Sequence, residues 1–188
     1  MAEFVLRALG ALFIYGFCVL PWSASADALK RPMAIHKLPA LGLEIWTEAR
    51  PEWEVRMDVK NGQSTFIAET PALTAPPAGM SWISSPAIAF TSVEMKDGAR
   101  GAIQQAALNY GHHEADRLEL RAASYGELTG YEARFSGDAH GMPVDVQIFC
   151  GHQPGKPAVL MHAFTLRGRL GLIGEHIRRS WTHVRYLK

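Results

Sequence analysis

Short runs in which apolar and polar residues alternate recur along the chain, and this period of two predicts strands that bury one face. In residues 143–151, the apolar positions recur at every second residue from Val144 to Cys150, with the polar Asp145 and Gln147 between them. Similar patterns predict further strands over residues 41–46, 51–59, 64–69, 118–120, 130–137 and 157–167, and residues 82–93 are apolar and rich in β-formers.

Two other segments repeat their apolar residues at helical spacing. One covers roughly residues 99–110, and the other begins at Leu170. Trp181 in the second helix and Trp53 in a strand fall in phase with apolar neighbours, so we expect both indoles to lie in the core. Strands joined by short turns, with the helices placed apart, predict an α+β fold in which an antiparallel β-sheet is covered by helices.

The first 26 residues have the pattern of a cleavable signal peptide. The uncharged, mostly apolar run over residues 8–22 is shorter than the roughly 20 residues that a membrane-spanning helix needs. Ala24-x-Ala26 then offers the small residues that a signal peptidase accepts. We therefore expect cleavage before Asp27, a periplasmic or secreted location, and no stable membrane anchor after cleavage.

The composition behind this leader predicts one domain without disulfide bonds. Residues 27–40 are polar and interrupted by prolines, so we expect a flexible lead-in followed by a single α+β domain over residues 41–188. The formal net charge of +1 gives no basic footprint for nucleic acid. Cys18 would leave with the leader, so Cys150 would remain alone and no internal disulfide could form.

Three short motifs mark the predicted elements in a recognisable order. They are Pro51-x-Trp53-x-Val55 in an early strand, Gly130-Tyr131 at the start of a later one, and Ile177-x-x-Ser180-Trp181-x-x-Val184 in the last helix. Together with the mid-chain helix and a three-stranded meander, this order resembles the PsbP/DcrB-like superfamily over roughly residues 41–187. The resemblance implies an α/β/α sandwich built on an antiparallel sheet, and mostly binding or assembly roles. It carries over no catalytic residue, because the superfamily has no shared active-site motif.

Histidine is the residue type that most suggests chemistry, with eight copies in the chain. The segment from His113 to Arg117 is similar to the helical zinc-protease signature, but Arg117 stands where the second histidine would have to ligate. Cys150 and His152 share a strand face and could meet one soft metal ion, with His162 as a third ligand if the strand register allows. A structural zinc site uses four ligands, so these three are weak candidates, and we expect no cofactor. A periplasmic metal-handling protein is therefore one alternative function.

Neither a nucleophile with a base nor a complete metal site can be assembled from the sequence, so we expect that the protein is not an enzyme. A small hydrolase whose site carries no known motif is a second alternative. Met80, Trp82 and Ile83 follow a proline-rich loop, and Phe149 lies on the nominally polar face of its strand, which predicts a partner-binding surface.

The favoured interpretation is a non-catalytic periplasmic binding module that acts by stoichiometric protein–protein interaction. Its partner would be a protein in the cell envelope. One version is an immunity or inhibitor protein directed against an exported toxin. The other is an accessory subunit of an envelope complex.

Overall fold

The computed structural model describes residues 32–70, 86–95, 97–139 and 141–188. The predicted signal peptide therefore lies outside the described residues. Arg31–Lys188 form one compact unit. Among the described residues, no helix is both long enough and apolar enough to cross a membrane.

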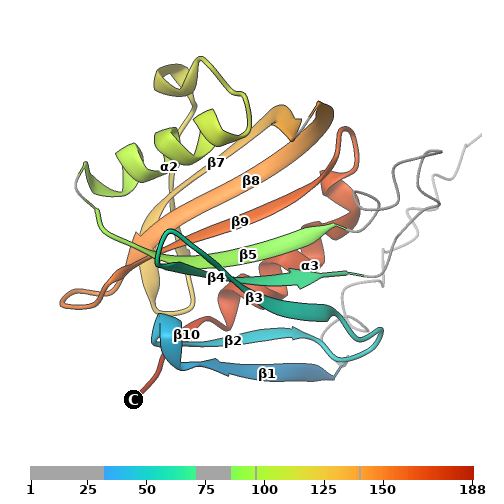
Figure 1. The fold of residues 1–188 in the computed structure, drawn as a ribbon, viewed down its shortest axis with the longest axis vertical. Helices are drawn as coiled ribbons and strands as arrows, with labels where there is room; N and C mark the ends of the chain where they lie inside the picture. The colour runs from blue at the N-terminus through green and yellow to red at the C-terminus, as the bar shows by residue number, and fades with distance from the viewer. Residues whose placement is uncertain (1–31, 71–85, 96, 140) are drawn as a thin grey trace, which may run out of the picture. The chain divides into compact units, whose positions relative to one another are not determined.

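A seven-stranded antiparallel sheet is the main element of this unit (Figure 1). In spatial order its strands are β3 (Glu54–Lys60), β4 (Gln63–Glu69), β5 (Ala87–Val93), β9 (Ala158–Leu166), β8 (Met142–His152), β7 (Leu128–Ala139) and β6 (Arg121–Tyr125). β9 is the central strand, and it joins two groups of strands that are each contiguous in sequence. β3 and β6 form the two edges of the sheet.

The two faces of this sheet are covered differently. Helix α2 (Gly98–Asn109) packs on β7, β8 and β9 on one face, which carries a core that includes Val146 and Ile148. Helix α3 (Leu170–Thr182) packs on the opposite face, where Phe149 and Met161 belong to a second core. The arrangement is α+β, with antiparallel strands between helices, as the alternating pattern predicts.

A second, three-stranded sheet lies on the α3 side of the structure. It consists of β1 (Met33–Leu38), β2 (Leu43–Glu48) and β10 (Arg185–Tyr186), with the short 3-10 helix η1 (Pro39–Leu41) between the first two strands. Residues 33–40 of the lead-in expected over residues 27–40 therefore form regular structure instead of a flexible segment. Met33–Leu38 pair with β2 along their whole length, because their half-buried alternation fits a strand despite the polar residues.

Two further strand predictions need correction. Residues 118–120 lie outside any strand, between the 3-10 helix η3 (Ala115–Arg117) and β6. On β3 the apolar residues Val55, Met57 and Val59 share one side, but they are 43%, 40% and 69% exposed. β3 is an edge strand, so its side chains extend beyond the part of the sheet that the core covers.

Both tryptophans predicted for the core are buried. Trp181 is fully buried in α3, and its ring lies edge-on to Tyr125 at 5.1 Å between centroids. Trp53 is 4% exposed and lies against the imidazole of His176 at 5.8 Å. Phe149 packs beside Trp181 at 6.5 Å, so the sheet and α3 share one aromatic cluster.

Candidate binding groove

A groove of about 820 Å³ opens beside α2, on the side of the helix toward β4 and β5. It exists because one helix cannot cover this sheet. Seven strands span about 29 Å, whereas a helix with its side chains is about 10 Å wide. Since α2 packs on β7, β8 and β9, the same face of β4 and β5 is left as an open floor. We call this space the α2 groove.

The floor of the α2 groove combines apolar side chains with hydroxyl groups. Thr65 of β4 and Thr91 of β5 are directly paired across the two strands, and their hydroxyl oxygens are 3.0 Å apart. The other described floor residues are Gln63, Ile67, Ala89, Val93, Leu160, His162 and Phe164. The floor therefore offers both hydrophobic contact and hydrogen-bonding partners.

The wall of the groove is the side of α2 that turns away from β7. Its described residues are Gly98, Gly101, Ala102, Gln104, Gln105, Ala106, Leu108, Asn109 and Tyr110. Leu108 is 43% exposed, so its apolar side chain is open to contact from within the groove. Three amide side chains on this wall can donate and accept hydrogen bonds.

Acidic residues mark the end of the groove where α2 begins. Asp97 precedes the first turn of the helix, and Glu94 follows β5. A Cβ atom at Gly101 would come within 2.5 Å of the Cβ of Asp97, so glycine at this position lets the Asp97 side chain lie against the helix. Asp97 and Glu94 thus place two carboxylates at this end of the groove.

His162 and Tyr110 occur together on the β9 side of the groove. The Tyr110 hydroxyl lies 3.3 Å from Nδ1 of His162, and the two rings are 5.9 Å apart. Burial lowers the pKa of His162 to about 4, so the imidazole is neutral near pH 7. Burial also raises the pKa of Tyr110 well above its ordinary value. Both groups can therefore serve as hydrogen-bonding partners, but neither is poised to exchange a proton near neutral pH.

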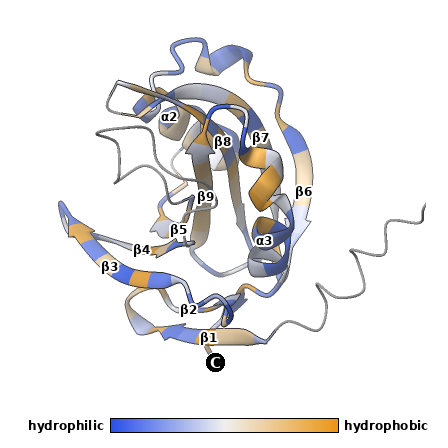
Figure 2. Ribbon diagram, turned by 90° about the vertical axis from the view of Figure 1, so that its right-hand side faces the viewer, coloured by the Kyte–Doolittle hydropathy of each residue, from blue (hydrophilic) through white to orange (hydrophobic). Residues whose placement is uncertain are grey.

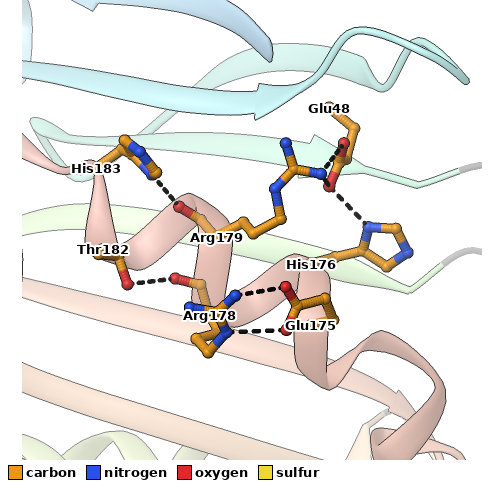
Figure 3. Close-up of polar contacts among 7 residues, drawn as sticks. All are labelled: Glu48, Glu175, His176, Arg178, Arg179, Thr182 and His183. Atoms are coloured by element: carbon orange, nitrogen blue, oxygen red, sulfur yellow. Dashed lines mark hydrogen bonds and ion pairs between the residues drawn. The ribbon is translucent and has the colours of Figure 1, made fainter. Parts of the chain in front are cut away.

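A separate polar cluster connects the small sheet to α3 (Figure 3). Both carboxylate oxygens of Glu48 accept hydrogen bonds from one Arg179 nitrogen, at 2.9 and 3.0 Å. His176 Nδ1 lies 3.2 Å from the same carboxylate. The Glu48 and Arg179 side chains are only 2% and 6% exposed. A charged pair buried this far between two elements fixes their packing, and we assign it a structural role.

The metal candidates from the sequence do not converge. Cys150 is fully buried, and burial raises the pKa of its thiol to about 12, which disfavours the thiolate that ligates metals. His152 lies at the end of β8, where its Nδ1 is 3.2 Å from the carbonyl oxygen of Gln153. His162 faces the same side of the sheet as Cys150, opposite Ile148, and contributes to the groove instead. Within the described residues, no three His, Cys, Asp or Glu side chains are grouped to hold a metal ion.

The predicted partner surface is corrected at Phe149. This side chain is fully buried, because α3 covers the strand face on which it lies. Gln147, two residues earlier in β8, is also buried, with 2% of its surface exposed. Its side-chain amide donates hydrogen bonds to Tyr125 and Glu132. Met80, Trp82 and Ile83 lie outside the described residues. The sequence did not predict the groove. Its only sign in the sequence was Tyr110, on the apolar side of the predicted helix.

Comparison with known proteins adds fold information. No family model and no curated protein matches the sequence. A crystal structure from Bacteroides thetaiotaomicron is similar with a TM-score of 0.52 and 12% sequence identity, over 82% of this chain and 48% of that one. A Pseudomonas aeruginosa protein of unknown function aligns with a TM-score of 0.45 and 11% identity, over 80% and 94% of the two chains.

The chain thus spans about half the length of the Bacteroides protein. At this identity the similarity shows the fold alone, which is α+β with antiparallel sheets and helices. The chain is placed in a fold class and not in a family.

Proposed function

We propose that the protein is a non-catalytic binding module of the periplasm that associates stoichiometrically with a protein of the cell envelope, and that the α2 groove is its binding site. The observation that carries this proposal is the open groove itself, about 820 Å³ in size, with apolar and hydrogen-bonding side chains side by side. Its size lies within the range of roughly 300–1,000 Å³ that is typical of ligand sites.

The chemistry of the groove suits a polypeptide segment. Amide and hydroxyl side chains on the floor and wall can bond to main-chain N–H and C=O groups of an extended segment. Leu108, Ile67 and Phe164 offer contacts for apolar side chains of that segment.

The location and the biological setting come from the sequence. The leader over residues 1–26 supports export, and the resemblance to the PsbP/DcrB-like superfamily supports a binding or assembly role. An immunity or inhibitor protein against an exported toxin and an accessory subunit of an envelope complex both fit such a module. Intact-mass measurement of the protein recovered from the periplasm tests the export: we expect a chain that begins at Asp27, and a mass that retains Met1 contradicts it.

Binding through the groove can be tested with a matched pair of leucine variants. Leu108 lines the groove from α2, whereas Leu172 is 57% exposed on α3, which covers the other face. The wild-type protein is first used to isolate its envelope partner, and the affinity of the purified partner is then measured for L108D and L172D. We expect L108D to weaken binding at least about tenfold, since it removes an apolar contact and adds a charge, and L172D to bind as the wild type does. Equal affinities for all three proteins would contradict a site in the groove.

A further inference from the structure

The edge strand β3 is exposed along its whole length, and its charged and apolar residues alternate. All seven of its residues, Glu54–Lys60, are exposed, and it pairs on one side with β4. Glu54, Arg56, Asp58 and Lys60 share the α2 side of the sheet, while the three apolar residues share the other side. Figure 2 shows this alternation as orange and blue segments along β3. An exposed edge strand is a template for pairing with another strand.

We propose that β3 pairs with β3 of a second copy of this chain, antiparallel and centred on Met57, so that the two large sheets become continuous. A two-fold axis at Met57 places every residue opposite a complementary one. The facing pairs are Glu54 with Lys60, Arg56 with Asp58, Val55 with Val59, and Met57 with Met57. Symmetry repeats each unlike pair, so four pairs of opposite charge and three apolar contacts form along one seam. Opposite charges and apolar residues placed directly across two strands stabilise the pairing.

The same pattern rejects the neighbouring registers. An axis at Arg56 would place Arg56 opposite itself and Glu54 opposite Asp58. An axis at Asp58 would place Asp58 opposite itself and Arg56 opposite Lys60. Like charges directly opposite each other are destabilising. A shift by one residue would set charged residues opposite apolar ones, so the charge pattern of β3 specifies one register.

The existing contacts of β3 are compatible with this pairing. Arg56 bonds to Glu69 on β4 and lies 3.5 Å from Asp58 on its own strand, yet the Arg56 and Asp58 side chains remain 49% and 54% exposed. Other described edges lack the pattern. β6, from Arg121 to Tyr125, has one charged residue and therefore no opposite charge to face it.

The proposed dimer is reversible and independent of what the groove binds. Seven residues extend about 23 Å, and one strand pair buries less than the roughly 1,600 Å² of a standard stable interface. We therefore expect association to depend on protein concentration. Because a two-fold axis normal to the sheet keeps each face continuous, the two α2 grooves would open on the same face of the joined sheet.

A charge swap tests the register. The full-length gene is expressed, and the protein that the cell produces from it is purified without further processing. Its sedimentation velocity is then measured over a range of protein concentrations. E54K brings a lysine opposite Lys60 of the second copy, and K60E brings a glutamate opposite Glu54. We expect each single variant to raise the dimer dissociation constant about tenfold or more, and E54K/K60E to restore it, because opposite charges face each other again. The double variant carries both substitutions, so it also controls for effects on the fold.

Cross-linking supplies an independent test of the axis. Under mild oxidation with oxidised glutathione, M57C should give a disulfide-linked dimer, because residue 57 faces its own copy. V59C should not, because its counterpart lies four residues along the strand, roughly 13 Å away. A wild-type protein that stays monomeric at the highest concentration overturns the proposal. So does a double variant that fails to recover the dimer, or cross-linking that is equal at positions 57 and 59.

Discussion

Replacing Glu48 by glutamine should destabilise the protein strongly, because it removes the carboxylate charge that faces Arg179 in a buried site. The two side chains are 2% and 6% exposed, and one guanidinium nitrogen donates to both carboxylate oxygens at 2.9 and 3.0 Å. Breaking such a pair from one side typically costs about 3–5 kcal/mol, because the buried guanidinium loses the carboxylate charge that faces it. Glutamine keeps the volume of the side chain, so no cavity contributes to the loss. We expect E48Q to lower the free energy of unfolding by about 3 kcal/mol.

The same helix provides a matched control (Figure 3). Arg178 donates two hydrogen bonds to Glu175, but these side chains are 54% and 45% exposed. The arginine holds the pKa of Glu175 below its ordinary value. Solvent screens an exposed helical pair, whose contribution to stability is usually below about 0.5 kcal/mol. E175Q, like E48Q, removes one carboxylate charge that faces an arginine of α3, but we expect a much smaller loss of stability.

Thermal and urea unfolding of E48Q and E175Q measure how much stability each variant loses. For a chain of this length, about 3 kcal/mol corresponds to a fall of roughly 6–12 °C in the unfolding midpoint, whereas E175Q should lower it by about 2 °C or less. A double-mutant cycle with R179M should give a coupling of about 2 kcal/mol or more between Glu48 and Arg179. If E48Q proved as mild as E175Q, the assignment of a structural role to the buried pair would be refuted.

Three further predictions follow from burial. W181A should lower the free energy of unfolding by about 3–5 kcal/mol in urea titrations, because it empties the aromatic cluster beneath α3, and an unchanged midpoint would contradict the placement of that helix. Cys150 should resist a maleimide at pH 7.5 in the native protein and react after denaturation, because burial raises its pKa to about 12; rapid native labelling would disprove this. The pKa of His162 is lowered by burial to about 4, against about 6.5 in the unfolded chain, so protons favour unfolding. Stability should therefore fall as the pH drops from about 6.5 to about 4, by about 3 kcal/mol, and H162Q should remove that part of the pH dependence in acid titrations followed by denaturant melts.

The elements that the sequence predicted best are those with one clear apolar face. Helix α3 has a single buried stripe that includes Ile173, Ile177 and Trp181, so its spacing was sufficient to place both the helix and the indole. β1 was missed because half-buried strands in a small sheet need few apolar residues, and its sequence is interrupted by His36 and Lys37. Its pairing with β2 supplies the stability that its composition does not show.

Phe149 shows why strand periodicity fails in a sheet covered on both sides. Five consecutive residues of β8, from Val146 to Cys150, are all buried, so polar Gln147 was a misleading marker of a solvent face. Whether a face is covered depends on where α2 and α3 pack, and no local pattern on the strand encodes it. The groove was unpredictable for the same reason. His162 could be assigned to the Cys150 face only conditionally, because the β8–β9 register depends on the turn between the strands.

The central position of β9 has a consequence for the order in which the chain can fold. β9 (Ala158–Leu166) lies between β5 and β8, so the early strands β3, β4 and β5 cannot join the later ones until the ribosome has made nearly the whole protein. Pairing β5 with β9 closes a long loop, which slows folding because its entropy must be lost before those contacts form. The large sheet therefore stays incomplete until synthesis is almost finished. The proposed export would benefit from this delay, because a translocation channel could engage the chain before the large sheet is complete.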